Sequence, residues 1–290
     1  MEFDPFLYVA FLAGLLAGRV VRPHTPWVGR ATLVTVGILV GLLGASLNVV
    51  PVPRLVETVP LALAFVVLIL GLTVAVYLVV ARAAPSPAPP AAPPSTGGQG
   101  KVPLSIALLG ALLAGYAVGH FLTVPAIAAL PWALYALLAL VAFDLKLRLE
   151  GLRRTWVPLT AAVGGSAMAA AVFIGLTGTP APAALATTFA FGWYTLAGPL
   201  VGAREGAVLG LLAFATNFLR EDLTMLLAPV LGRRLRGEGL TAMGGATSMD
   251  TTLFFATRYG DPDAGSLALA SGLILTVTAS LLLPALLALP

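Results

Sequence analysis

The stretch NFLREDLTMLL, residues 217–227, sets four polar or charged side chains in the middle of an apolar run that spans residues 206–232. Those four side chains are Asn217, Arg220, Glu221 and Asp222. A run of this length can cross a bilayer, because a transmembrane α-helix needs about 20 mostly apolar residues. An ionised side chain at the centre of such a helix costs roughly 2.5–3.5 kcal/mol on insertion scales, so this cluster needs partners or a function.

The whole chain shares this apolar character. Of its 290 residues, 59% are hydrophobic and 10% are charged, and the mean hydropathy is +1.00. A soluble domain cannot cover its surface with so little polar area. The composition therefore predicts an all-α polytopic membrane protein in a lipid bilayer, and the net charge of +4 bears on membrane orientation rather than on a nucleic-acid partner.

Metal and thiol chemistry have little support in the sequence. The chain has no cysteine, and its two histidines, His24 and His120, lie far apart without a ligand-spaced partner. The sequence also lacks an activated nucleophile and an acid–base pair near an aqueous surface. We therefore expect no enzyme activity, no catalytic residue, no metal site and no cofactor.

Eight apolar segments approach or exceed the length that a membrane crossing needs. They are residues 5–21, 31–49, 59–81, 103–122, 130–148, 156–176, 206–232 and 265–288. Two further segments, residues 181–201 and 237–258, are too broken or polar for ordinary crossings. The sequence thus predicts about eight transmembrane helices and two re-entrant or broken segments.

Basic residues set the orientation of these segments. With the N-terminus outside, Arg54 and Arg204 lie on the external side, Arg220 lies at membrane depth, and the remaining Lys and Arg residues lie on the cytoplasmic side. Such a bias follows the positive-inside rule. We expect a multi-pass protein with both termini outside.

An internal repeat divides the chain. Residues 12–21, LAGLLAGRVV, resemble residues 110–121, GALLAGYAVGHF, and a short Pro-Trp loop and another apolar helix follow each of them. We predict a first three-helix repeat at residues 1–83, a Pro/Gly-rich cytoplasmic linker at 84–102, and a second repeat with the C-terminal transport-site region at 103–290. Three crossings invert the second copy, and inverted repeats are common in secondary transporters.

The two broken segments have the features of cavity-lining elements. Prolines and glycines interrupt residues 181–201, while residues 237–258 contain a Gly244-Gly245 pair, several hydroxyls and Asp250. Non-helical backbone survives at membrane depth only where protein or a water-filled cavity satisfies its polar groups. We expect the two segments to enter from opposite sides and to meet near the midplane; interfacial loops and full crossings are the alternatives.

The charged cluster has a net negative balance. Asn217, Arg220 and Glu221 share one helix face, and Asp250 is expected to join Glu221 and Asp222 as a third acid. Arg220 can partly neutralise Glu221 or Asp222, but the acids outnumber it, and ionisable groups inside a membrane are functional by default. A metal ion, a proton or an organic ammonium suits such a pocket. An internal ion pair that only fixes helix packing is the alternative.

A further acid, Asp144, lies near the inner end of its apolar segment, beside Lys146 and Arg148. A salt-bridged acid that extends to the membrane interface is the simpler interpretation of this position. Asp144 is therefore a secondary candidate for the site.

Four strings stand out in the C-terminal half of the chain. They are FGWYTL (residues 191–196), NFLREDLTMLLAPVL (217–231), GGATSMDTTL (244–253) and SGLILT (271–276). Together they resemble the LysO lysine exporter family. The resemblance implies a bacterial-type inner-membrane protein that exports L-lysine and protects against toxic lysine analogues, with functional acids at Glu221 and Asp250. Phe254 departs from the family pattern, which usually has Pro at that place.

The residues themselves agree with a basic amino acid as the substrate. Carboxylates of Glu221 and Asp250 can hold its ammonium groups through charge-assisted hydrogen bonds, and Arg220 or a half-helix N-terminus near Gly245 can hold its carboxylate. The predicted substrate- and ion-binding set is completed by Asn217, Asp222, Thr247, Ser248 and Tyr194.

Export of a cation from a negative cytoplasm needs an energy source, because moving one charge outward costs about 2.3 kcal/mol per 100 mV. The sequence has no Walker motif, so we expect antiport with inward protons, and sodium is the alternative coupling ion. A buried carboxylate can hold a proton or an ammonium but not both, which is sufficient for coupling. A sodium/proton-type cation exchanger or channel that uses the same acids, and a scaffold without transport, are the alternative functions. The oligomeric state stays open, a homo-oligomer included.

Overall fold

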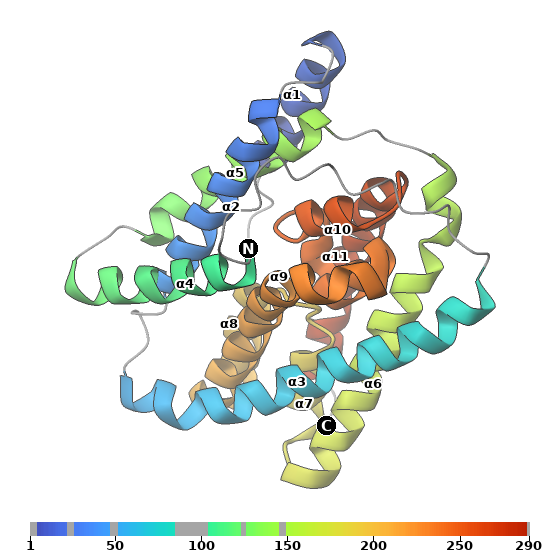
Figure 1. The fold of residues 1–290 in the computed structure, drawn as a ribbon. Coiled ribbons are helices and arrows are strands. Elements are labelled where there is room, and N and C mark those ends of the chain that lie inside the picture. The colour runs from blue at the N-terminus through green and yellow to red at the C-terminus, as the bar shows by residue number, and fades with distance from the viewer. Residues whose placement is uncertain are drawn as a thin grey trace. The chain divides into compact units, whose positions relative to one another are not determined.

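The computed structural model describes residues 5–21, 26–46, 52–84, 104–122, 126–144 and 149–288, and the regular elements in these ranges are all helices (Figure 1). In chain order they are α1 (Pro5–Val21), α2 (Pro26–Ser46), α3 (Val52–Ala83), α4 (Leu104–Phe121), α5 (Ala126–Asp144), the 3-10 helix η2 (Leu149–Arg154), α6 (Trp156–Thr177), α7 (Ala181–Thr188), α8 (Tyr194–Glu205), α9 (Ala207–Gly244), the 3-10 helix η3 (Gly245–Met249), α10 (Leu253–Tyr259) and α11 (Ala264–Leu287). An apolar chain in lipid requires helix, which satisfies its own backbone groups. The predicted all-helical class is confirmed.

Each predicted crossing coincides with a helix over its described residues. Three helical stretches are long and apolar enough to cross a membrane, namely Glu57–Ala83, Leu152–Thr177 and Ala264–Leu287. Shorter apolar helices cover Val9–Val20, Trp27–Leu42 and Ile106–Phe121. These are the helices of a membrane protein, and the count of eight crossings stays a prediction. The predicted linker, residues 84–102, lies outside the described residues except for Ala84.

One compact unit contains α1, α2, α4 and α5. In this unit α1 packs against α5, and α2 packs against α4 and α5. A Cβ added at Gly14 or Gly18 would collide with the α5 backbone, and one added at Gly115 would collide with the backbone of Gly41 in α2. Helices in membranes commonly associate through such small residues, because their backbones can then approach closely.

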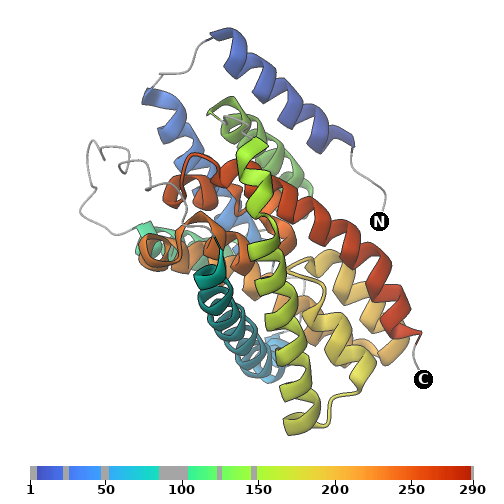
Figure 2. The same ribbon diagram turned by 90° about the vertical axis from the view of Figure 1, so that its right-hand side faces the viewer.

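The second unit contains α3 and the helices from α6 to α11. A Cβ added at Gly165 of α6 would collide with Thr73 of α3, and Phe65 of α3 stacks on Phe173 of α6. Helix α11 lies beside α6 and the α7–α8 segment (Figure 2). Buried apolar side chains of α6, α7, α8, α9 and α11 form one core cluster in this unit. The grouping of α3 with α6 leaves the predicted division into repeats untested, since repeats are defined by symmetry rather than by contact.

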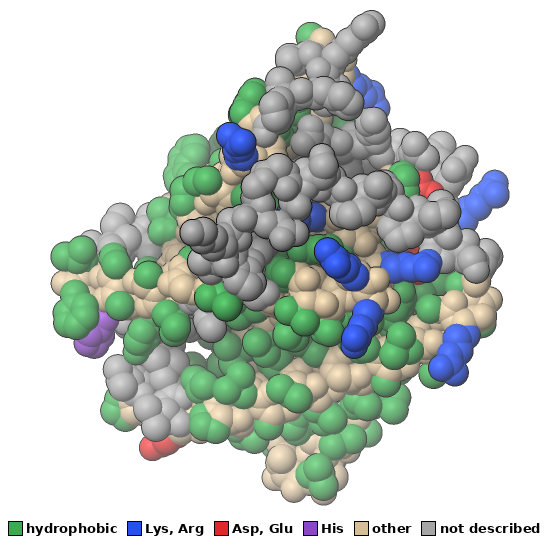
Figure 3. Space-filling model, in the orientation of Figure 1, with side chains coloured by type: hydrophobic (Ala, Val, Ile, Leu, Met, Phe, Trp, Pro, Cys, Tyr) green, Lys and Arg blue, Asp and Glu red, His purple; other side chains and the backbone are tan. Residues whose placement is uncertain are grey.

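Large apolar side chains are exposed on the outside of the helices. Val20 and Phe121 are 82% exposed, and Leu176 is 80% exposed. Figure 3 shows hydrophobic side chains spread over the described helices, with Lys and Arg side chains between them. Soluble surfaces rarely expose contiguous apolar area of this kind, whereas a surface that faces lipid does so.

Helix α9 has 38 residues and a sharp kink at Arg236, where φ is 56° and ψ is −174°. In a straight helix residues 220 and 243 would lie about 35 Å apart. Yet the Nε atom of Arg220 lies 3.0 Å from the Met243 carbonyl oxygen, so the helix folds back at Arg236. The sequence places a boundary after residue 232; in the structure the helix continues, and the kink separates the two parts.

Candidate functional site

The first of two helix breaks interrupts the predicted broken segment at residues 181–201. Helix α7 ends at Thr188 and α8 begins at Tyr194. Between them Phe191 has a φ of 53° and Gly192 a φ of 96°. A positive φ is uncommon for a residue with a side chain, so the surrounding structure must hold Phe191 in this conformation.

Asn217 of α9 connects this break to the charged cluster. Its Oδ1 accepts a hydrogen bond from the Gly192 N–H at 2.8 Å, and its Nδ2 donates to the carbonyls of Thr187 and Ala213, both at 2.9 Å. The residue is 1% exposed. Asn217 therefore satisfies the Gly192 N–H and the Thr187 carbonyl between α7 and α8, and both of its Nδ2 hydrogens are used.

The second break lies at the Gly244-Gly245 pair, where the sequence predicts it. Helix α9 ends at Gly244, and Gly245, with a φ of 65°, begins η3. The Ser248 hydroxyl lies 2.9 Å from the Ala268 carbonyl of α11 and donates to it. A Cβ added at Gly272 of α11 would collide with the η3 backbone, so α11 supports this break at close range. Because η3 is a short 3-10 turn, Gly245 does not begin a half-helix that could bind a carboxylate.

Residues 237–260 form a helical hairpin whose two ends meet. A Cβ added at Gly237 would lie 2.9 Å from the Gly260 Cα, and one added at Gly232 would collide with the Tyr259 ring. The chain thus runs inward along the end of α9, turns at the second break and returns along α10.

The two breaks contact each other. The Ala246 N–H donates a hydrogen bond to the Phe191 carbonyl at 2.9 Å. A Cβ added at Gly192 would lie 3.3 Å from the Gly244 carbonyl oxygen and from the Thr247 Cγ2 atom. The two segments that the sequence singles out are therefore joined at their broken centres.

Arg220 is buried and directed at the end of α9. Its Nε donates to the Met243 carbonyl at 3.0 Å, and its Nη2 donates to the Ala242 carbonyl at 3.3 Å. A cation suits this place because the last carbonyls of a helix carry partial negative charge. Among the described residues Arg220 forms no ion pair with Glu221 or Asp222, contrary to the expected neutralisation. Its Nη1 has no partner there and can still donate to a ligand.

Glu221 and Asp250 lie on either side of Thr251. The Asp250 Oδ1 atom accepts hydrogen bonds from the Thr251 N–H at 2.6 Å and from the Thr251 hydroxyl at 3.3 Å. Glu221 interacts with the Thr251 side chain and lies within electrostatic range of Asp250. Glu221 is 3% exposed and its Oε1 has no partner in the described structure, while Asp250 is partly exposed. The two central acids of the predicted site thus converge, one enclosed and one accessible.

Asp222 is the most isolated member of the cluster. It is 2% exposed, and neither of its carboxylate oxygens has a hydrogen-bond partner within the described residues. Its charge lies within range of Glu221 and of the Tyr194 hydroxyl. No three His, Asp or Glu side chains are grouped to hold a metal ion in the part of the chain that the structure describes.

Two of the predicted hydroxyls serve the backbone of the second break. The Thr247 hydroxyl donates to the Gly244 carbonyl at 3.0 Å, and the Ser248 hydroxyl lies 2.8 Å from the Gly245 carbonyl. Both side chains are buried. Thr247 and Ser248 therefore shape the turn, and the structure gives neither of them a direct role toward a ligand.

Tyr194 has a different place. Its ring packs edge-on against Phe214 and Phe218, with ring centroids 5.3 Å and 5.4 Å away. Three acids lie within electrostatic range of its hydroxyl, namely Glu221, Asp222 and Asp250. Tyr194 is therefore the predicted hydroxyl that lies among the acids.

Asp144, the secondary candidate, is the last residue of α5 and belongs to the unit of α1, α2, α4 and α5. Its side chain, and the neighbouring Lys146 and Arg148, lie outside what the structure describes. The role of Asp144 stays a prediction.

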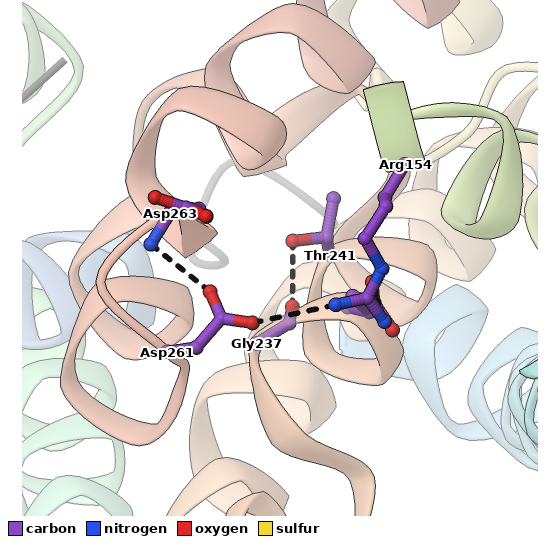
Figure 4. A network of polar contacts seen from close by, with 6 residues as sticks. Arg154, Gly237, Thr241, Asp261 and Asp263 are labelled. Atoms are coloured by element: carbon purple, nitrogen blue, oxygen red, sulfur yellow. Dashed lines mark hydrogen bonds and ion pairs between the residues drawn. The ribbon is translucent and has the colours of Figure 1, made fainter. Parts of the chain in front are cut away.

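A second polar network, which we call the clamp, consists of Arg154, Glu238 and Asp261. The Arg154 Nη2 atom lies 2.5 Å from Glu238 Oε1, and its Nη1 atom lies 3.6 Å from Asp261 Oδ2. Figure 4 shows that Asp261 also accepts a hydrogen bond from the Asp263 N–H, at 3.0 Å. The clamp joins η2, the end of α9 and the loop before α11.

Neither the clamp nor Thr251 was predicted. From the sequence, Arg154 is expected to be one of several charged residues in a solvent-exposed loop. No spacing in the sequence links it to Glu238. Thr251 directly follows Asp250 in the string TSMDTT, and a hydroxyl next to a buried acid is the signal that could have identified it.

An all-helical membrane fold, with two joined helix breaks and ionisable side chains enclosed beside them, defines a polytopic membrane transport protein. Broken helices of this kind form the binding sites of many secondary transporters, and ionisable residues inside such folds mark substrate or ion pathways.

Comparisons with known proteins agree with this class. The family model described as lysine exporter LysO matches residues 109–287. The chain is 35% identical over 198 residues to the lysine exporter LysO of Escherichia coli (strain K12), and this alignment covers 63% of each of the two chains. It is 28% identical over 125 residues to a putative lysine exporter of Haemophilus influenzae, and that alignment covers 43% of this chain and 61% of the relative. The aligned part thus spans less than two thirds of either relative.

The chain belongs to the LysO lysine exporter family, a family of transporters rather than enzymes. No solved structure matches the chain.

Proposed function

We propose that this protein is a secondary active exporter of L-lysine or a related basic amino acid in the cell inner membrane, with toxic lysine analogues as further substrates. The observation that carries the proposal is the convergence of Glu221 and Asp250 around Thr251, in a chain whose two helix breaks are joined. Membership of the family, and relatives named as lysine exporters, support it.

The chemistry of the site suits both ends of a basic amino acid. Glu221 has an oxygen without a partner and Asp250 is partly exposed, so both can accept charge-assisted hydrogen bonds from ammonium groups. Arg220 Nη1 is a buried donor without a partner, and it can bind the substrate carboxylate. Tyr194 supplies a hydroxyl beside the acids. Asn217, Thr247 and Ser248 position the backbone of the breaks.

The energy for export comes from an ion that moves inward, most simply the proton. Lysine is a net cation, and moving it outward costs about 2.3 kcal/mol per 100 mV of membrane potential. Acids that can hold either a proton or an ammonium group provide the exchange that antiport needs.

Helix pairing supports an inverted repeat. In the first unit α1 packs on α5 and α2 packs on α4, and in the second unit α3 packs on α6. Each helix of the predicted first repeat thus contacts a helix of the second, and exchange of the two repeats turns the α1–α5 contact into the α4–α2 contact. The distribution of the basic residues supports an orientation with both termini outside and the linker in the cytoplasm.

A sodium/proton-type cation exchanger or channel is the second candidate. The unpartnered oxygens of Glu221 and Asp222 favour it, because a small cation needs only such oxygens and no partner for a substrate carboxylate.

Lysine counterflow in proteoliposomes distinguishes the two candidates. Vesicles that contain purified protein are loaded with unlabelled L-lysine and placed in trace radiolabelled L-lysine without an ion gradient. An exporter takes up the label transiently, faster than vesicles without protein. A cation exchanger or channel gives no lysine-dependent uptake, and that result would contradict the proposed function.

A further inference from the structure

Asp222 differs from its neighbours in having no partner. Asp250 accepts two hydrogen bonds from Thr251, and Glu221 interacts with the same threonine. Both oxygens of Asp222 are without a hydrogen-bond partner among the described residues, although the residue is only 2% exposed. A buried polar group without a partner is rare in native proteins and calls for a ligand or a change of charge state.

Asp222 has buried apolar neighbours on its own helix face. Phe218 precedes it by one helical turn and Met225 follows by nearly one turn, and they are 2% and 1% exposed. The titratable groups within electrostatic range are Glu221 on the same helix and Tyr194 on α8. Neither of these groups is a cation, so neither can stabilise an ionised Asp222.

Arg220 is the cation that lies nearest to Asp222 along the helix, but its guanidinium donates to the carbonyls of Ala242 and Met243. An unpaired charge in an apolar interior is far more costly than a neutral group. In this arrangement burial therefore favours Asp222 with a proton bound, and entry of water into the site favours its ionisation.

We propose that Asp222 is the binding site of the coupling proton, separate from the Glu221–Asp250 pair that holds the substrate. This inference rests on the proposed function and specifies how transport is coupled. An external proton forms an O–H bond with a carboxylate oxygen of Asp222 while the site is open to the outside. The O–H bond breaks when the site opens to the cytoplasm, and the proton passes to water there.

This arrangement couples the two ions through the conformational change. The closed state with an empty substrate pair forms only when Asp222 is neutral, so the return step carries a proton inward. In the loaded state the ammonium groups of the substrate at the neighbouring Glu221 supply the positive charge that an ionised Asp222 otherwise lacks, so the export step carries no proton outward.

The test compares two lysine fluxes in the same proteoliposomes, counterflow without a gradient and uptake driven by a pH gradient. A pH-sensitive dye inside the vesicles reports lysine-dependent proton movement. We expect Asp222→Asn to lower the ratio of driven flux to counterflow by about tenfold or more, a size typical of coupling between two sites. Lysine-dependent proton movement should be lost with it.

Glu238→Gln is the matched control, because it also neutralises a buried acid of α9, one that is paired with Arg154. Its flux ratio should equal that of the wild type. An unchanged ratio in Asp222→Asn overturns the inference. An equal loss of counterflow and driven flux in folded Asp222→Asn also overturns the inference, because Asp222 would then be needed for binding or moving the substrate itself.

Two outcomes separate this inference from the proposed function. If the wild type shows counterflow but a sodium gradient, not a pH gradient, drives its uptake, then the proton site is wrong and lysine transport stands. If the wild type shows no counterflow, the proposed function fails, and the inference fails with it.

If the Asp222→Asn variant does not insert into the membrane, the Asp222→Glu variant is used in its place. An unshifted pH profile of driven uptake in that variant contradicts the inference.

Discussion

The backbone amide of Ala246 lies 2.9 Å from the carbonyl oxygen of Phe191, and this hydrogen bond joins the two helix breaks. Each break leaves backbone groups without helical partners, and the interior of a bilayer has no water to satisfy them. The two breaks satisfy part of this need from each other, and Asn217 and Arg220 supply further hydrogen bonds. The contact between the breaks is therefore a precondition for the arrangement of the acids beside it.

Close packing at Gly245 gives the first prediction. Gly245 and Gly178 have nearly equal φ values, 65° and 66°. Gly178, with a ψ of 16°, lies in the left-handed helical region, where a side chain costs about 1–2 kcal/mol, whereas Gly245 has a ψ of −123°, outside that region and more strained for a side chain. A Cβ at Gly245 would also lie 2.5 Å from the Phe191 carbonyl oxygen and 3.1 Å from Arg220 Nη2, whereas a Cβ at Gly178 has no atom within 4 Å.

Gly245→Ala should therefore lower the melting temperature of the detergent-solubilised protein clearly more than Gly178→Ala does. Size-exclusion chromatography after heating measures both variants. Equal losses in the two variants would mean that the contact between the breaks contributes nothing to stability.

Removal of the Asn217 or Arg220 side chain gives the second prediction. Asn217→Ala strands the Gly192 N–H and the Thr187 carbonyl, and Arg220→Ala strands the carbonyls of Ala242 and Met243. Each stranded group costs about 1–3 kcal/mol. We expect a higher KM for lysine with some transport retained, and no such change in Arg204→Ala, whose side chain is exposed. If Arg220→Ala abolishes folding, Arg220 has a structural role in place of a binding one.

The clamp gives the third prediction. Arg154→Ala leaves Glu238 buried without its cation, and breaking a buried ion pair costs about 3–5 kcal/mol. The melting temperature should fall strongly, and Arg154→Lys should restore part of the loss. The double variant Arg154→Ala/Glu238→Gln should be more stable than Arg154→Ala alone. Additive losses in the double variant would show that the two side chains do not stabilise each other.

Topology gives the fourth prediction. The chain has no cysteine, so single cysteines can be introduced at Ser95 and Pro290 and tested with an impermeant thiol reagent in intact cells. We expect labelling at position 290 and none at position 95. External labelling of position 95 would overturn the proposed orientation, and the inverted repeat with it.

The elements of the fold could be predicted from the sequence because lipid permits few solutions. Apolar length predicted the helices, and Gly244-Gly245 and the prolines around residues 181–201 predicted the breaks. The fold-back at Arg236 could not be predicted, because the residue that adopts the φ of 56° is neither Gly nor Pro.

The residues of the site could be predicted better than their roles. Charged side chains in an apolar run are conspicuous, which identified Glu221 and Asp250. The sequence does not show which donor atoms bond to which acceptor atoms, so Arg220 was expected to pair with the adjacent acids. In the structure it donates hydrogen bonds to carbonyls 22 and 23 residues away along the chain. Thr251 and the clamp were not predicted because their importance arises only when distant segments meet.

Neutralising Glu221 and Asp250 tests the central claim, that these two acids hold the substrate, most directly. Glu221→Gln and Asp250→Asn keep size and hydrogen-bonding capacity but remove the charge, and each should still insert because neutral groups lower the cost of insertion. We would measure radiolabelled lysine transport driven by a pH gradient in vesicles, for the wild type and both variants, between about pH 5.5 and 8.5, on both sides of physiological pH. We predict normal amounts of both variants and loss of driven lysine transport in each. Near-normal, proton-driven lysine flux in both variants would contradict the claim.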